Sequence, residues 1–172
     1  MWGRRTTIHL DEASLTSTVV VADYHGASIA IARERAESAG AVAHVDFEVA
    51  TASGYGGSDY DLVTMVNCFH EMGDSVGVAT HLRETFAEAG AWMIDEPFAD
   101  DRIEANPTSF DHLVNSISTV AGMPNALSQD VGSSLWAQAG EERIRTVVTE
   151  GGFTRFHKAA ETPTSPVFEA TP

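Results

Sequence analysis

The chain has 172 residues, 43% of them hydrophobic and 20% charged, which is ordinary for one soluble globular domain. Its 25 acidic and 10 basic side chains give a formal net charge of −15, which argues against nucleic acids and anionic membrane surfaces as partners. No apolar run approaches the roughly 18 residues of a membrane span, and the single cysteine, Cys68, excludes an internal disulfide. We therefore expect a cytoplasmic protein with neither a nucleic-acid nor a membrane partner.

The first predicted strand ends in an acidic residue. Val19–Ala22 is a continuous apolar run typical of a buried parallel strand, and Asp23 follows it directly. The apolar spacing then predicts a helix over 28–39 that Gly40 ends, and a second strand over 44–49 with alternating apolar residues. An acid between a strand and a helix is typical of the second βα unit of a nucleotide-binding sheet, where it accepts hydrogen bonds from ribose hydroxyls.

The middle of the chain predicts two further strands around one helix. Residues 61–67 form an apolar strand, and 91–95 form another that ends before Pro97. Between them the spacing predicts a helix over about 75–88 that stops at Gly90. One stripe of this helix is formed by Val78, Leu82 and Phe86.

The last third predicts two helices and a hairpin. The helices cover residues 108–121 and 141–150, and the strands cover 153–160 and 167–170. The short proline-rich connection between these strands requires them to be antiparallel. Strand and helix alternate over the chain, which predicts an α/β fold with a mostly parallel sheet. The stripe of the first helix is formed by Phe110, Leu113, Val114, Ile117 and Val120.

Five segments in this order resemble class I S-adenosylmethionine-dependent methyltransferases over about residues 3–170. The segments are VVVADYHGASI, FEVATAS, YDLVTMVNCFHEMGD, AGAWMIDEPF and the pair GGFTRF…VFEA. The likeness is greatest to bacterial, notably actinobacterial, members that carry a winged-helix-like region before the catalytic domain, and residues 124–129 and 137–141 add to it. It implies a Rossmann-like methyltransferase sheet closed by a C-terminal antiparallel hairpin, with S-adenosyl-L-methionine as cofactor and a small-molecule acceptor. The resemblance also implies a homodimer as the assembly of full-length members of the family.

The resemblance also implies which residues hold the cofactor. Asp23 would bind the ribose, and Tyr24 would border the adenosine pocket. The adenine ring would lie against Ala50, Thr51 and Ala52, where family members often have an Asp that this chain lacks.

Three further residues follow the strand over 61–67. Asn67 and Cys68 would adjoin the methionine part of the cofactor, and we expect Cys68 to be a buried filler and not a nucleophile. His70 would lie at the rim, where a histidine can take a proton from an acceptor hydroxyl, although it can equally cap the next helix. We expect no metal site, because the histidines lack ligand spacing.

No glycine-rich turn precedes the strand that ends at Asp23. We therefore expect one N-terminally truncated methyltransferase domain over 1–172 that lacks the first strand, with residues 4–13 as a remnant of the first helix. The family sheet order places that strand between those at 19–23 and 61–67, so two edges would be left unpaired and cofactor binding impaired.

Two alternatives stay open. The chain could be a non-catalytic methyltransferase remnant or pairing module. It could also be a nicotinamide-dependent dehydrogenase, which uses an acid at the same place, although the closing hairpin argues against that.

Overall fold

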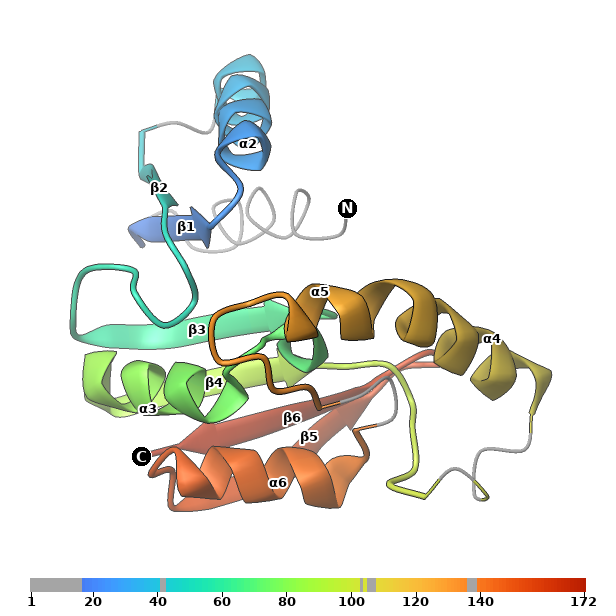
Figure 1. Cartoon of the computed structure of the whole chain (residues 1–172). Helices are drawn as coiled ribbons and strands as arrows, with labels where there is room; N and C mark the ends of the chain where they lie inside the picture. The colour runs from blue at the N-terminus through green and yellow to red at the C-terminus, as the bar shows by residue number, and fades with distance from the viewer. Residues whose placement is uncertain (1–16, 41–42, 103, 105–107, 136–138) are drawn as a thin grey trace. The chain divides into compact units, whose positions relative to one another are not determined.

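The computed structural model describes residues 17–40, 43–102, 104, 108–135 and 139–172 (Figure 1). The predicted remnant helix over 4–13 lies outside these residues. The chain divides into two compact units, residues 1–56 and 57–172, and each is described below by itself. The described strands form two separate sheets, one in each unit. The prediction of one domain over the entire chain stays a prediction.

The first unit is a parallel strand pair joined by a helix. It contains β1 (Val19–Asp23), α2 (Gly26–Ala39) and β2 (Val45–Val49), and Asp23 pairs in register with Val49. These elements confirm the predicted strand, helix and strand, but β1 is not buried as expected, because its residues alternate between half-buried and exposed. Gly40 ends α2 in the left-handed conformation, with φ 72°, which a glycine adopts without a Cβ penalty.

The buried face of α2 follows the predicted spacing. Ile29 and Ala36 are 2% and 4% exposed, and α2 packs against β1 and β2. On β2, Val45 is buried, Phe47 is half-buried and Val49 is 60% exposed, so the cover of the predicted common face decreases along the strand.

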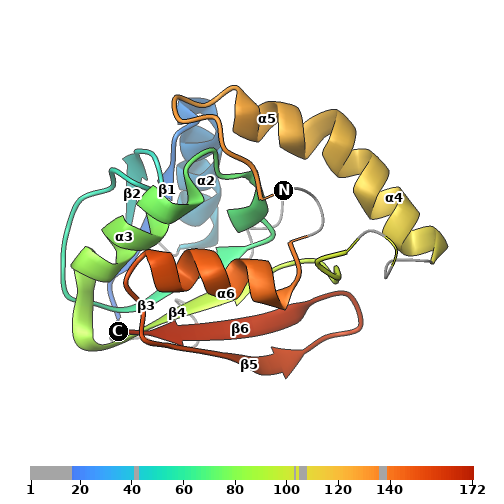
Figure 2. The same cartoon turned by 60° about the horizontal axis from the view of Figure 1, so that its bottom comes forward.

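The second unit is a four-stranded sheet in the order β3-β4-β6-β5. β3 and β4 are parallel, whereas β6 runs antiparallel to both β4 and β5. The parallel pairs joined by helices and the closing antiparallel hairpin confirm the predicted α/β fold. Helices α3 and α6 lie side by side on one face of the sheet (Figures 1 and 2). The elements are β3 (Tyr60–Val66), η1 (Phe69–Glu71), α3 (Ser75–Thr85), β4 (Phe86–Asp95), α4 (Ser109–Ile117), η3 (Ser118–Gly122), α5 (Met123–Leu127), α6 (Glu141–Glu150), β5 (Arg155–Glu161) and β6 (Pro166–Thr171).

An aromatic cluster forms the centre of this unit. Trp92 on β4 is fully buried, and the Phe69 ring meets it edge-on with 4.8 Å between ring centroids. The ring of Phe153, two residues before β5, has its centroid 5.4 Å from that of Trp92. Edge-to-face contacts of this kind stabilise the folded chain by more than the burial of their apolar area alone. The cluster therefore holds the start of η1 against the sheet.

The predicted helix over 75–88 is three residues too long. α3 ends at Thr85, and Phe86 opens β4 opposite Tyr60 before the regular ladder resumes at Ala91. Phe86 is buried as its stripe position suggested, but it packs edge-on against Phe153, with centroids 5.8 Å apart. Gly90 lies in the irregular stretch, where a Cβ would come within 2.6 Å of the Tyr60 carbonyl oxygen, so it permits a close approach and does not stop the helix.

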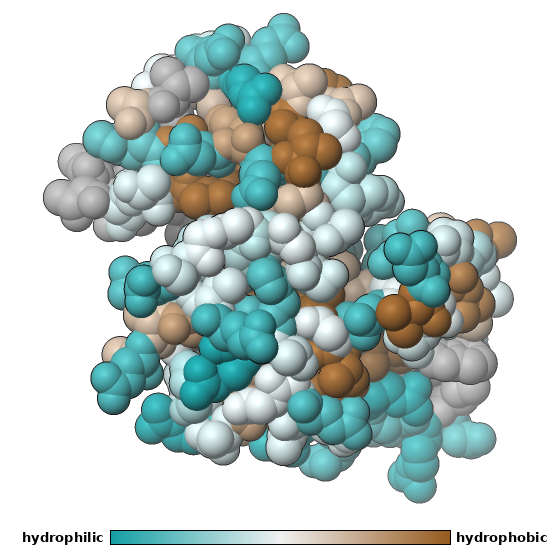
Figure 3. Space-filling model, turned by 60° about the vertical axis from the view of Figure 1, so that its left-hand side comes forward, coloured by the Kyte–Doolittle hydropathy of each residue, from teal (hydrophilic) through white to brown (hydrophobic). Residues whose placement is uncertain are grey.

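The predicted helix over 108–121 is present, and the chain stays helical beyond it as α4, a π-helical turn η3 and α5. Its apolar stripe is largely uncovered, because Leu113, Ile117 and Val120 are 55%, 56% and 77% exposed. On the face shown in Figure 3, apolar residues form separate groups among hydrophilic ones. Within the described residues, no helix has both the length and the apolar character needed to cross a bilayer.

Candidate functional site

In the first unit the carboxyl ends of β1 and β2 lie at the same edge. The backbone N–H of Ala50 donates to the carbonyl oxygen of Asp23 at 3.2 Å, so the two strand ends are direct neighbours. The Asp23 carboxylate is held in a turn, because its Oδ1 accepts the backbone N–H of His25 at 2.8 Å. We call Asp23 with Ala50, Thr51 and Ala52 the β1–β2 edge.

The turns that follow these strands are short and open. Tyr24 is 64% exposed on the connection from β1 to α2. Thr51 starts a turn in which its carbonyl oxygen accepts the N–H of Gly54 at 3.0 Å, and Thr51 itself is exposed. The β1–β2 edge therefore offers one carboxylate and one exposed hydroxyl, and the exposed phenol of Tyr24 follows Asp23 in the chain.

In the second unit a sharp turn follows β3. Asn67 has φ 52°, a left-handed conformation that Asn tolerates better than most side chains. Its N–H donates to the Asp95 carbonyl oxygen at 2.7 Å, which continues the β3–β4 ladder by one residue. The chain then enters η1, which carries Phe69 at its start and His70 in its middle.

Glu96, which the sequence reasoning missed, organises this turn. It follows the last residue of β4 and is 3% exposed. Its Oε1 accepts the backbone N–H groups of Cys68 and Phe69 at 3.1 and 2.7 Å, and its Oε2 pairs with Nδ1 of His70. A buried carboxylate is tolerated only with such partners. We call Asn67, Cys68, His70 and Glu96 the β3–β4 edge.

A sequence signal for Glu96 does exist. Two acids, Asp95 and Glu96, follow the apolar run over 91–94, and the pattern that singled out Asp23 points to the first of them. Because β3 and β4 are parallel neighbours, the residues that follow them meet at one edge. Applying the strand-end argument to every strand would have placed this pair of acids at the edge that holds Asn67 and Cys68, without showing which of the two turns inward.

The charge environment of His70 favours its protonated form. Burial of the ring lowers the pKa of His70, but the hydrogen bond and charge of Glu96, assisted by the charge of Glu71, outweigh burial and raise it above its ordinary value. Nε2 of His70 lies 4.0 Å from Oε1 of Glu71. With Nδ1 taken by Glu96, Nε2 is the ring nitrogen left to exchange a proton with another molecule.

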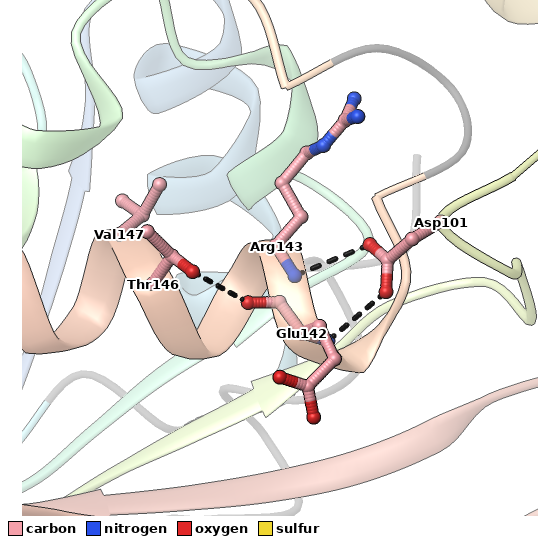
Figure 4. A pocket seen from close by; sticks show the side chains of 5 residues that line it. All are labelled: Asp101, Glu142, Arg143, Thr146 and Val147. Carbon is pink, nitrogen blue, oxygen red and sulfur yellow. Dashed lines mark hydrogen bonds between the residues drawn. The ribbon is translucent and has the colours of Figure 1, made fainter.

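A surface pocket of about 350 Å³ lies elsewhere, at the start of α6 (Figure 4). The Asp101 carboxylate accepts the backbone N–H groups of Glu142 and Arg143, both at 3.2 Å. Asp101 thereby caps α6 from a segment distant in sequence. It occupies the backbone N–H groups that a bound anion would need. None of the predicted site residues lines this pocket. In the part of the chain that the structure describes, no three His, Cys, Asp or Glu side chains are grouped so that they could hold a metal ion.

Comparison with known proteins shows the fold. No protein-family model and no curated protein matches the chain. Among solved structures, "PigF with SAH" matches with a TM-score of 0.74 at 12% identity, over 96% of this chain and 46% of that one. The mitomycin 7-O-methyltransferase MmcR matches with a TM-score of 0.68 at 13% identity, over 94% and 44%.

The S-adenosylmethionine-dependent methyltransferase SibL matches with a TM-score of 0.67 at 17% identity, over 96% of this chain and 46% of that one. This chain thus has the fold of a class I methyltransferase domain, as the sequence resemblance implied, and it spans less than half the length of these structures.

Proposed function

We propose that this chain is a domain for S-adenosylmethionine-dependent methyl transfer to a small-molecule hydroxyl acceptor. The observation that carries the proposal is the presence of two strand-end edges with the chemistry that such a reaction needs. The β1–β2 edge presents the Asp23 carboxylate, and the β3–β4 edge presents a histidine whose Nδ1 is paired with a buried glutamate. The fold shared with PigF, MmcR and SibL supports this class of reaction.

The residues at the β1–β2 edge fit the adenosine part of the cofactor. A carboxylate at the end of a strand can accept hydrogen bonds from both ribose hydroxyls, and charge-assisted bonds of this kind contribute about 1.5–3 kcal/mol. Asp23 takes this role in the proposal, with Tyr24 beside the ring system. Ala50, Thr51 and Ala52 would adjoin the adenine, which the backbone groups of these residues can recognise without a further carboxylate.

The residues at the β3–β4 edge fit the reacting half. Asn67 and Cys68 would adjoin the methionine part. When bound, the cofactor would supply a methyl group whose bond to a positively charged sulfur breaks as an acceptor oxygen attacks the methyl carbon, with the sulfur leaving as a neutral thioether. His70 would take the proton of the acceptor hydroxyl on Nε2, and Glu96 would stabilise the resulting imidazolium. Because the pKa of His70 is raised, the rate should increase with pH until His70 is fully neutral.

The affinity for the cofactor is expected to be weak. Among the described strands, β1 and β3, which carry the two edges, belong to separate sheets. A second candidate function follows from the same observation, namely a non-catalytic binding or pairing module with the methyltransferase fold.

The test is calorimetric titration with SAH, the product that S-adenosylmethionine becomes when it gives up its methyl group. Saturable binding that is weaker in Asp23→Asn supports the proposal, and His70→Gln should bind equally well while transferring no methyl group. Binding of a reduced nicotinamide cofactor without binding of SAH would overturn the proposal in favour of a dehydrogenase. Absence of both would favour the non-catalytic module. A dissociation constant in the low micromolar range would overturn the expectation of weak binding.

A further inference from the structure

The segment that carries His70 is held on its other side by the end of α5. The side chain of Gln129 bonds to the backbone of this segment at two points: its Oε1 accepts the N–H of Gly73 at 2.8 Å, and its Nε2 donates to the carbonyl oxygen of Glu71 at 2.9 Å. A longer bond runs from Nε2 to the local carbonyl oxygen of Asn125 at 3.4 Å. An amide group can do both at once, because it carries a donor and an acceptor on neighbouring atoms. Gln129 thus pairs with this segment as a neighbouring strand would.

Ser133 completes the attachment. Its N–H and its hydroxyl both donate to the carbonyl oxygen of Gly73 at 2.8 Å. The fit is close, since a Cβ at Gly73 would lie 2.5 Å from the carbonyl oxygen of Ala126 and equally near Cβ of Gln129. Both backbone groups of the buried Gly73 therefore depend on the segment from Gln129 to Ser133.

His70 lies between two attachments of different kinds. On one side, Glu96 binds the backbone of Cys68 and Phe69. On the other, Gln129 binds the backbone of Glu71 and Gly73. Within its unit, the helical stretch α4–η3–α5 contacts η1 through α5. A displacement of α5 is therefore transmitted to the turn that carries the His70 ring.

We propose that Gln129 is a positioning residue that fixes the orientation of the His70 ring by tying the end of α5 to the backbone of Glu71 and Gly73. The inference rests on the proposed function only for its catalytic meaning, since the positioning itself is a property of the free chain. It couples the position of the helical stretch α4–η3–α5 to the orientation of the His70 ring.

The test compares Gln129→Met, which keeps the length but loses both bonds, with Gln129→Glu, which keeps only the acceptor for Gly73. Ser128→Ala is the matched control at the same helix end, because the Ser128 hydroxyl donates only to the local Asn125 carbonyl oxygen. The measurements are the two ring ¹⁵N shifts of His70, assigned by their loss in His70→Gln, and the hydrogen-exchange rate of the Gly73 N–H.

In Gln129→Met we expect exchange at Gly73 to be about ten times faster, since a buried N–H loses its partner. The His70 ring shifts should move towards those of a histidine that averages both tautomers. Gln129→Glu should change the ring shifts less, and Ser128→Ala should resemble the unmodified chain. Unchanged His70 ring shifts in Gln129→Met would overturn the proposal, since the bonds would then only anchor α5. If Gln129→Met does not fold, Gln129→Glu decides instead: it loses the bond to the Glu71 carbonyl oxygen, so unchanged His70 ring shifts in this variant would overturn the proposal. None of these readouts needs cofactor or acceptor, so failure of the proposed function appears separately, as absence of SAH binding.

Discussion

Replacing Glu96 with Gln tests the electrostatic arrangement around His70. The substitution keeps the shape of the side chain and an oxygen for the N–H groups of Cys68 and Phe69, but it removes the negative charge paired with His70. Of the causes acting on His70, burial lowers its pKa, and two of the three that raise it come from Glu96. In Glu96→Gln, burial is opposed by Glu71 alone, so the pKa of His70 should fall below its ordinary value.

The same substitution predicts a pH-dependent loss of stability. Because the pKa of His70 is raised on folding, its stabilising contribution is fully present below the unfolded pKa of about 6.5 and is lost as the pH rises through the folded value. A hydrogen bond between charged groups contributes about 1.5–3 kcal/mol, and one between neutral groups about 1 kcal/mol. Glu96→Gln should therefore destabilise the second unit by about 2–3 kcal/mol near pH ~5.5 and by about 1 kcal/mol near pH ~9.

Urea unfolding followed by tryptophan fluorescence, to which the buried Trp92 contributes, measures this difference at both pH values, and NMR titration gives the pKa of His70. Glu88→Gln is the control, because it removes the same charge from an exposed position on β4. An equal loss of stability at both pH values, or a His70 pKa that stays above its ordinary value in Glu96→Gln, would refute the reasoning.

Further variants test the other parts of the account. Asp23→Asn should weaken SAH binding by about 10–100-fold, because a charge-assisted hydrogen bond contributes about 1.5–3 kcal/mol. Asp46→Asn, on the exposed side of β2, should leave binding unchanged. Equal effects of the two substitutions in calorimetry would argue against a ribose contact. Gly73→Ala should destabilise the second unit by about 1–3 kcal/mol, because its Cβ would meet backbone and side-chain atoms 2.5 Å away. In Gly56→Ala the nearest atom lies 3.8 Å away, so its urea midpoint should be nearly unchanged, and a similar drop in both variants would contradict the packing argument.

The elements of the fold were predictable because their signals are local. The apolar run before Asp23, the spacing of Ile29 and Ala36, and the short turn of the closing hairpin each depend on residues close in sequence. The boundary between α3 and β4 was not predictable in this way. Phe86 continues the helical spacing, but its contact with Phe153, more than sixty positions later, draws it into the strand.

The candidate site was predictable only in part for the same reason. Strand-end reasoning placed Asp23 beside Ala50, and it placed Asn67 and Cys68 after β3. The pairing of His70 with Glu96 depends on which strand lies next to β3, and the bonds from Gln129 depend on the fold of a helix that begins almost forty residues after His70. Periodicity also identified the stripe of Leu113, Ile117 and Val120 correctly as helical, but it carries no information about whether another segment covers it.

The most direct test of the account is an amide NMR titration of the ¹⁵N-labelled chain with SAH at concentrations up to the millimolar range. If SAH contacts both strand-end edges, we expect one saturating curve to describe the shifts at Asp23, at residues 50–52 and at residues 67–70. Arg143, beside the Asp101 pocket, should change little. Shifts confined to that pocket, or none at the two strand-end edges when SAH is in large excess, would contradict it.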